Sequence, residues 1–212
     1  MNFLNPEMTS LLNTMANTTP QSADSSWFLS QERFLTSSEL KRLLRLTEQR
    51  KTEAMYDGKK TAVKEWFLIT VATETGLRVQ EIADLNCGDI HADGQWRMLS
   101  VRNGKGNKPR PVIVRKEFIA ACHEFFAWKR KQGESTEREA PIFVTMGRRM
   151  TKRALQKAYE RTLVRAGISQ PQGVGIHSLR HTYASFLLVA SGFNLRLVQK
   201  QLGHASVRTT QA

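Results

Sequence analysis

The chain has 212 residues, of which 32 are Lys or Arg and 19 are Asp or Glu, giving a formal net charge of +13. Such a basic balance points to a polyanionic partner, and a hydrophobic content of 40% is too high for a disordered basic tail. No apolar run approaches the ~20 residues needed to cross a bilayer, and no segment combines a dense basic face with a Trp/Phe face. The two cysteines, Cys87 and Cys122, have neither metal-ligand nor disulfide-framework spacing. Composition therefore indicates a folded, basic, cytoplasmic protein without membrane association.

Residues 1–30 are rich in Asn, Ser and Thr, contain Pro6 and Pro20, and show no regular apolar period. They are predicted to form a flexible polar leader or linker. Residues 31–212 suffice for one domain of ordinary size, and neither an internal repeat nor a low-complexity tract divides them. We therefore expect a single folded domain after the leader.

The first part of this domain is predicted to be helical. Thr36 and Glu39 form a capping box at the start of a helix that runs through Leu46. Residues 60–75 are too densely apolar for a surface helix, and Gly76 is a natural C-terminal stop. That second helix is therefore expected to be mostly buried.

A β-hairpin is predicted in the middle of the chain. Residues 96–101 and 111–115 are rich in β-forming residues, and the Gly and Asn residues of the basic segment 102–109 between them tolerate turn geometry. Further helices are predicted over residues 79–85, 116–131, 151–166, 178–191 and 195–202, with another beginning at Ser206. The expected fold class is mainly α with one small antiparallel β-sheet, an α+β domain.

Histidines and arginines near the C-terminal end form a pattern suited to phosphate chemistry. His177 and Arg180 lie three positions apart, so one face of a helix presents both, and Arg78 can supply a second guanidinium. Two arginines can hold the non-bridging oxygens of a phosphate in a fork geometry. His177 and His204 suit proton transfer, because imidazole changes its charge near neutral pH. These residues predict a phosphate-handling site.

Ordinary structural roles remain open for each of these residues taken alone. Arg78 and Arg180 could be surface or salt-bridge arginines, and Glu81 stands one helical turn from Arg78. Either histidine could cap a helix or pack in the core. His177 and His181 have the i, i+4 spacing of a zinc-binding helix, but no Glu follows His177 and no Cys ligand is near. No metal site is predicted.

Lys105 lies between two glycines at the predicted hairpin tip. A lysine there reaches beyond the sheet, where it could contact a DNA minor groove or protonate a leaving oxygen. Lys108 competes for the same role. The alternative is that these lysines only keep a hairpin tip soluble.

Four segments taken in order carry a resemblance that no single motif establishes. They are Thr75-Gly76-Leu77-Arg78-Val79-Gln80-Glu81-Ile82, Gly104-Lys105-Gly106-Asn107-Lys108, His177-Ser178-Leu179-Arg180-His181 and Leu202-Gly203-His204-Ala205-Ser206. In this order and spacing they resemble the catalytic domain of tyrosine recombinases, the phage-integrase family, over residues 36–212. The resemblance implies the integrase catalytic-domain fold and a DNA-cutting and DNA-joining chemistry that needs neither a metal nor a nucleotide cofactor.

The resemblance also implies a role for each matching residue. Arg78 and Arg180 match the two phosphate-binding arginines, and Glu81 the acidic residue that supports the first. Lys105, with Lys108 as the alternative, matches the general acid that protonates the leaving 5′ oxygen. The remaining implied positions are His177 and His204 as the two histidines of the site, His181 as a supporting residue, and Lys105, Lys108, Arg110, Arg78 and Arg180 as DNA contacts.

The family's nucleophile, a tyrosine shortly after the Gly-His pair, has no match. Here Thr209-Thr210-Gln211-Ala212 runs out just before the corresponding place. Tyr56 is expected in a polar loop, Tyr159 within the helix after Thr151, and Tyr183 is expected to serve helix packing. We expect a chain truncated just before its catalytic tyrosine, and therefore inactive in DNA cleavage.

The resulting expectation is the catalytic domain of a site-specific recombinase or integrase that acts on double-stranded DNA of a mobile element or chromosome, in the nucleoid. An inactive DNA-binding regulator of recombination sites is the alternative, and a type IB topoisomerase-like enzyme is disfavoured by the small size and the integrase-like Gly-Lys-Gly-Asn-Lys turn. The family also implies a homo-tetramer on DNA for a full-length member. Family members usually carry a helical core-binding domain before the catalytic domain; the polar leader is not expected to supply one, and this chain is expected to be monomeric.

Overall fold

The computed structural model describes residues 35–92, 97–102, 109–169 and 175–203. The predicted leader, the hairpin tip with Lys105 and Lys108, and the segment from His204 onward with its helix from Ser206 lie outside these residues. No helix among the described residues is long and apolar enough to span a membrane.

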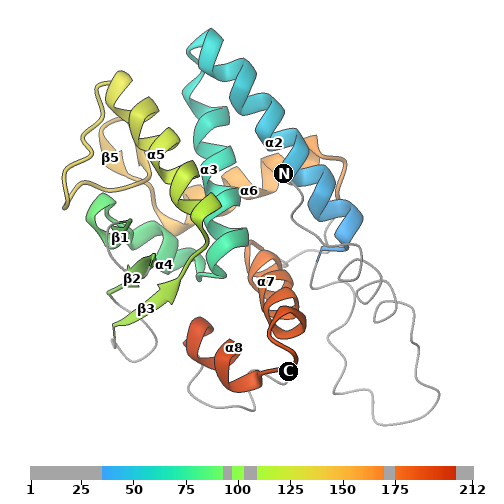
Figure 1. Ribbon diagram of the computed structural model, residues 1–212. Coiled ribbons are helices and arrows are strands. Elements are labelled where there is room, and N and C mark those ends of the chain that lie inside the picture. The colour runs from blue at the N-terminus through green and yellow to red at the C-terminus, as the bar shows by residue number, and fades with distance from the viewer. Residues whose placement is uncertain (1–34, 93–96, 103–108, 170–174, 204–212) are drawn as a thin grey trace.

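Helices make up most of the described chain (Figure 1). They are α2 (Ser37–Asp57), α3 (Lys60–Thr75), α4 (Val79–Asp84), α5 (Lys116–Lys131), α6 (Lys152–Arg165), α7 (His177–Ala190) and α8 (Leu195–Leu202), with a 3₁₀ turn, η3 (Cys87–Asp89). The predicted bounds of α3, α5 and α8 are confirmed; α4 differs by one residue at its C-terminal end, and α6 and α7 differ by one residue at each end. The predicted fold class, mainly α with little β-structure, is confirmed.

The strands form two small antiparallel sheets. Strands β1 (Ile90–His91), β2 (Met98–Val101) and β3 (Arg110–Ile113) pair in that order, and β4 (Val144–Thr145) pairs with β5 (Arg148–Arg149). Val101 lies opposite Arg110, so β2 and β3 form the base of the predicted hairpin. The expectation of one sheet was wrong for the described residues, because two-residue strands are too short to show alternation in the sequence.

The capping box that starts α2 is confirmed. The hydroxyl of Thr36 accepts a hydrogen bond of 3.3 Å from the Glu39 amide, and the Glu39 carboxylate accepts one of 2.8 Å from the Thr36 amide. The helix runs well beyond the predicted Leu46 and ends at Asp57. Its last turns contain a buried lysine, Lys51, whose ammonium pairs with carboxylates and thus replaces an apolar core residue. Apolar periodicity alone therefore underestimated the helix.

Helix α3 lies at the centre of the domain, as its density of apolar residues predicts. It packs against α2, α5, α6 and α7, and Figure 1 shows it between α2 and α5. The Phe67 ring stacks on Phe125 of α5 with 4.0 Å between centroids. Neither ring is exposed to solvent. This core fixes the C-terminal end of α3, from which the next functional residues follow.

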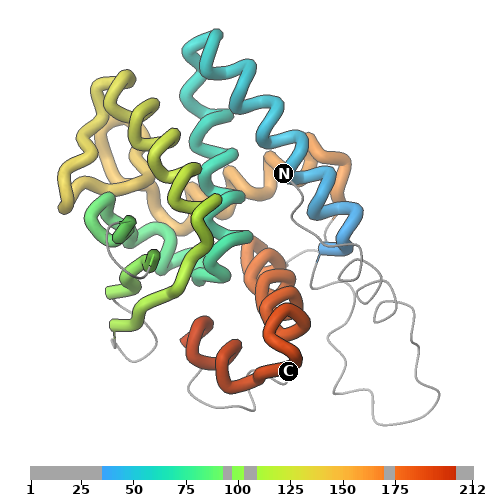
Figure 2. The backbone as a smooth tube through the Cα atoms, in the orientation of Figure 1, coloured from blue at the N-terminus to red at the C-terminus, as the bar shows by residue number. Residues whose placement is uncertain are grey.

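Helices α7 and α8 lie at the end of the domain where α3 terminates. Helix α7 packs on α3, and α8 packs on both α7 and strand β3. The backbone trace in Figure 2 shows α8 beside the end of the domain that carries β2 and β3. Elements far apart in sequence therefore meet at one place: the start of α4, the start of β3, the start of α7 and the end of α8.

Candidate active site

Glu81 is a buried carboxylate in the first turn of α4. One of its oxygens accepts a 2.8 Å hydrogen bond from the amide of Arg78, and the other accepts a 3.0 Å bond from Nη1 of that residue. A carboxylate at this position also interacts favourably with the positive end of the helix dipole. Glu81 therefore holds both the main chain and the guanidinium of Arg78 in place, as the predicted supporting residue would.

Two further arginines approach the same carboxylate from distant parts of the chain. Arg110, at the start of β3, donates from Nη1 to Oε1 at 2.8 Å and from Nη2 to Oε2 at 3.1 Å. Nη1 of Arg180, from α7, lies 3.9 Å from Oε2. We call Glu81, Arg78, Arg110 and Arg180 the Glu81 cluster. Burial alone would raise the pKa of Glu81, but bonds from Arg110 and Arg78 outweigh it and hold the pKa below its ordinary value.

Arg180 is buried and makes two hydrogen bonds to main-chain carbonyls. Its Nη1 donates to the Gly76 oxygen at 2.7 Å, and its Nη2 donates to the Leu202 oxygen at 2.8 Å. Burial, followed by the charge of Arg78, lowers the pKa of Arg180 to about 10. The guanidinium thus remains charged at neutral pH, and its two carbonyl partners fix its plane. Each terminal nitrogen carries a second N–H beyond the one that binds a carbonyl.

His177 is the first residue of α7 and is exposed, one helical turn before Arg180. Partial removal of water from the ring, followed by the charges of Arg180 and Arg78, lowers the pKa of His177. At neutral pH the imidazole is therefore mostly uncharged. An uncharged imidazole can either donate or accept a hydrogen bond at an anionic ligand.

The two other residues singled out on α7 lie outside the Glu81 cluster. His181 is half-buried, and its carbonyl accepts a hydrogen bond from the Ser185 hydroxyl. The Tyr183 ring covers Gly76 so closely that a Cβ added there would lie 2.3 Å from Cδ1 of the ring. Its hydroxyl lies 3.4 Å from Nε2 of Gln201, and burial raises the pKa of Tyr183. Tyr183 is thus a packing residue, as its sequence position predicts.

The two remaining tyrosines also lie in structural positions. The hydroxyl of Tyr159, a buried residue of α6, is 2.6 Å from that of Ser178. Tyr56 was wrongly predicted to lie in a loop: it is a residue of the last turn of α2, 88% exposed, where α2 turns into α3. Figure 1 shows this turn at the opposite end of the domain from α7 and α8.

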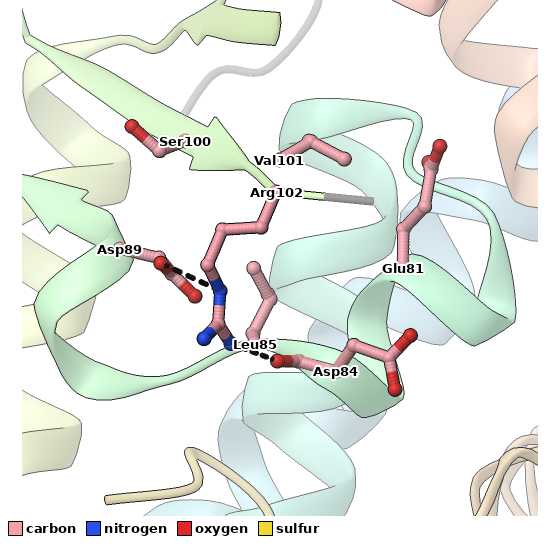
Figure 3. Close-up of a pocket in the computed structure, with 7 residues that line it drawn as sticks. All are labelled: Glu81, Asp84, Leu85, Asp89, Ser100, Val101 and Arg102. Atoms are coloured by element: carbon pink, nitrogen blue, oxygen red, sulfur yellow. Dashed lines mark hydrogen bonds and ion pairs between the residues drawn. The ribbon is translucent and has the colours of Figure 1, made fainter. Parts of the chain in front are cut away.

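Lys105, Lys108 and His204 lie outside the described residues, but the chain on either side of them is described. A small pocket lies beneath the β2 end of the hairpin, where Arg102 places Nε 3.2 Å from Asp89 and donates from Nη2 to the Asp84 carbonyl at 2.6 Å. Figure 3 shows Arg102 between these two partners, with Glu81 pointing away from it. At the other end of the hairpin, Arg110 binds Glu81.

The Glu81 cluster is suited to bind an anion, such as a phosphate, that two guanidinium groups contact together. Three guanidinium groups and one carboxylate give the cluster a net charge of +2. The Arg78 side chain is 28% exposed, so solvent reaches part of the cluster. Charge-assisted bonds from arginine to phosphate are short and strong. Within residues 35–92, 97–102, 109–169 and 175–203, no group of three or more His, Cys, Asp or Glu side chains is arranged to hold a metal ion.

Two members of this arrangement were not predicted in their observed roles. Arg110 was predicted as a DNA contact, and its hydrogen bonds to Glu81 were not predicted; Gln201 was not singled out, although it bonds to strand β3. The sequence carried only a weak signal for the first: a basic residue at the start of a strand close to the hairpin tip. Neither pairing is local, since 29 positions separate Arg110 from Glu81.

Known proteins of one family resemble this chain in sequence. Residues 33–212 match the phage integrase family. Tyrosine recombinase XerH of Campylobacter jejuni is 32% identical over 179 residues, covering 84% of this chain and 47% of the relative. Tyrosine recombinase XerC of Proteus mirabilis is 34% identical over 153 residues, covering 71% and 47%. The chain therefore spans about half the length of these relatives.

Solved structures give the same result for the fold. XerH recombinase bound to a palindromic difH substrate, in a post-cleavage complex, superposes with a TM-score of 0.70 at 25% identity, covering 89% of this chain and 51% of that one. The catalytic domain of bacteriophage HP1 integrase shares the fold with a TM-score of 0.55 at 22% identity, covering 84% and 83%. The predicted integrase catalytic-domain fold is confirmed. By sequence and by fold, the chain belongs to the phage integrase family of tyrosine recombinases.

Proposed function

We propose that this chain binds double-stranded DNA and activates one phosphodiester for site-specific strand exchange. The observation that carries the proposal is the convergence of Arg78 and Arg180 on buried Glu81, with His177 one turn away. DNA as the partner is further supported by the similar XerH structures, which are complexes with a difH substrate before and after cleavage.

The proposed chemistry follows from the charges of the site. Arg78 and Arg180 bind the non-bridging oxygens and stabilise the charge that builds on them in the pentacoordinate transition state. A tyrosine oxygen gives up its proton, which the uncharged His177 can accept, and forms a bond to phosphorus as the bond to the 5′ oxygen breaks. By family resemblance, Lys105 gives that oxygen its proton, with Lys108 as the alternative donor, and His204 binds the phosphate beside His177.

Rejoining reverses the same steps. The 5′ hydroxyl of a partner strand attacks the 3′-phosphotyrosyl bond and releases the tyrosine, so the energy of the broken DNA bond is retained in the covalent intermediate. No metal or nucleotide takes part in this scheme. For a complete protein we extend the proposal to a homo-tetramer on DNA, with residues 31–212 as its catalytic domain and residues 1–30 as a linker.

The attacking tyrosine is proposed to be none of the three in this sequence. Tyr159 is buried against Ser178, Tyr183 is packed on Gly76, and Tyr56 lies at the far end of α2. This observation also favours a second candidate function, in which the chain occupies recombination sites as a DNA-binding regulator without cutting them.

A nicked suicide DNA substrate, which traps the covalent intermediate, separates the two functions. We expect no protein–DNA adduct from the 212-residue chain, and an adduct when a tyrosine-bearing segment from the Campylobacter relative follows Ala212. In the extended chain, Arg180→Ala should reduce the adduct by about 100-fold or more, as expected for loss of a group that stabilises the transition state.

Denaturing gel electrophoresis of labelled DNA is the measurement. An adduct from the 212-residue chain would refute the assignment of its tyrosines. If the extended chain bound DNA but formed no adduct, the regulator would be the better description.

A further inference from the structure

Arg110 donates its hydrogen bonds to protein groups, whereas an arginine that contacts DNA needs free N–H groups for the phosphate or the bases. Both of its terminal nitrogens bind the two oxygens of Glu81 in parallel, at 2.8 and 3.1 Å. Its side chain is 12% exposed, between the 7% of Arg180 and the 28% of Arg78, so the carboxylate bound to its fork, and not its burial, sets it apart. Its fork is thus already occupied by a carboxylate, the ligand that competes most directly with a phosphate.

The same side chain also contacts the end of α8. Its Nε donates to the Gln201 carbonyl at 3.3 Å. A Cβ added at Gly203 would lie 2.8 Å from both Cδ and Nε of Arg110, so the stem of this arginine lies directly against the Gly203 backbone. Arg110 therefore contacts both Glu81 and the last residues before His204.

Gln201 adds a second connection between the same two elements. Its side-chain oxygen accepts from the Ile113 amide at 3.1 Å, and its Nε2 donates to the Ile113 carbonyl at 3.0 Å. This pair of bonds fastens α8 to the edge of β3, as a neighbouring strand would. Arg110 and Gln201 together hold the end of α8 at a fixed distance from the base of the hairpin.

We propose that Arg110 is a positioning residue that fixes the end of α8 and the base of the hairpin to Glu81, and that it is not a DNA contact. The inference rests on the proposed function, because it concerns how that site is assembled. Arg110 lies five positions after Lys105 in the chain, and Gly203 immediately precedes His204. One side chain thus ties the chain segments next to both residues to the cluster that contains Arg78 and Arg180.

The first test is hydrogen–deuterium exchange of the α8 backbone amides in the free protein. Arg110→Met removes the bonds to Glu81 and Gln201 but keeps an unbranched apolar stem. We expect protection in α8 to fall by about tenfold or more, while α2, α3 and α5 remain protected, because only local contacts are lost. Arg102→Met is the matched control: it removes an ion-paired arginine from the other end of the hairpin and should leave α8 unchanged.

The second test is the salt dependence of binding to duplex DNA. A lost phosphate contact reduces the slope of log K against log salt by about 1. We expect Arg110→Met to leave the slope unchanged. In the chain extended with a tyrosine-bearing segment, it should slow adduct formation by about tenfold or more at saturating DNA, a loss in rate and not in binding.

Arg110→Lys keeps the positive charge but cannot form the two parallel hydrogen bonds to Glu81. It replaces Arg110→Met in both tests if that variant does not fold. Under the proposal it loosens α8 by a smaller factor at an unchanged salt slope. A slope reduced by one unit in Arg110→Met and restored by Arg110→Lys, with α8 protected throughout, would overturn the proposal in favour of a DNA contact. A flat salt response of the unmodified chain would contradict the proposed function alone, because the exchange experiment contains no DNA.

Discussion

Glu81 is the one carboxylate around which Arg78, Arg110 and Arg180 gather. Removing its charge would leave these guanidinium groups facing one another in a largely buried place, a more costly state than the original pairing. Glu81 therefore has a structural effect that can be separated from any effect on phosphate binding.

Glu81→Gln is expected to lower the free energy of unfolding at pH 7 by about 3 kcal/mol, the usual cost of breaking a buried ion pair from one side. Urea denaturation measures this loss in the free energy of unfolding. Glu53→Gln is the matched control, because Glu53 is an exposed residue of α2 bonded only to Gln49 among the described contacts, and it should change stability by less than about 0.5 kcal/mol. Equal effects of the two substitutions would contradict the role given to Glu81.

The pH dependence of this effect has a definite sign. The folded pKa of Glu81 lies below its ordinary value of 4.5, so its stabilisation is complete above that pH and is lost as the pH falls through the lower folded value. The stability curves of the unmodified protein and of Glu81→Gln should therefore converge in acid. Curves that stay parallel from pH 7 to about pH 3 would be inconsistent with a lowered pKa.

At the scale of single residues, the sequence pointed to the members of the site but not to their partners. The spacing of Arg78 and Glu81 is one helical turn, and that pairing could be anticipated and was found. The link from Arg110 to Glu81 joins a strand to a helix, and no local rule relates them. Which distant side chains contact each other depends on tertiary packing, and local sequence patterns do not reveal it.

At the scale of elements, the junction between α3 and α4 depends on one glycine. Gly76 has φ of +60°, a left-handed conformation that disfavours any Cβ, and its carbonyl receives Arg180. The Tyr183 ring and the Leu202 side chain fill the space where a Cβ would stand. Helices α3, α7 and α8 therefore meet at a point with no room for a methyl group.

Gly76→Ala should cost about 2–4 kcal/mol, because backbone strain and overpacking act together. Gly58→Ala provides a matched control: Gly58 ends α2 with a similar φ of +69°, but nothing lies within 4 Å of its Cβ position. That substitution should cost only about 1 kcal/mol. Chemical denaturation of both variants measures the difference, and equal losses would show that the close approach of Tyr183 does not matter.

Elements were predictable to the extent that burial imposes a period on them. The apolar density of α3 and α5 gave their bounds correctly, and the capping box of Thr36 and Glu39 marked the start of α2. The second half of α2 was missed because Lys51 occupies a buried position where the pattern called for an apolar residue. Strands β4 and β5, of two residues each, offer no period to detect.

At the scale of the whole molecule, the net charge of +13 is the property most relevant to the proposed partner. Affinity for duplex DNA should fall steeply as salt rises, with a log–log slope of about −0.9 for each phosphate neutralised. A fluorescence anisotropy titration from about 50 to 200 mM salt measures it, and a slope of several units is expected. A slope near zero would count against DNA as the partner of this basic fold.

The two carbonyl partners of Arg180 have a consequence for the order in which a newly made chain matures. Leu202 is synthesised 22 residues after Arg180, whereas Gly76 is synthesised 104 residues before it. With ribosomes adding about 5–20 residues per second, a nascent chain passes through a stage in which α3 can fold but the arginine lacks its second carbonyl. Under the proposed function, translation itself delays phosphate binding, because a chain still on the ribosome before Leu202 emerges has no complete site with which to engage nearby DNA.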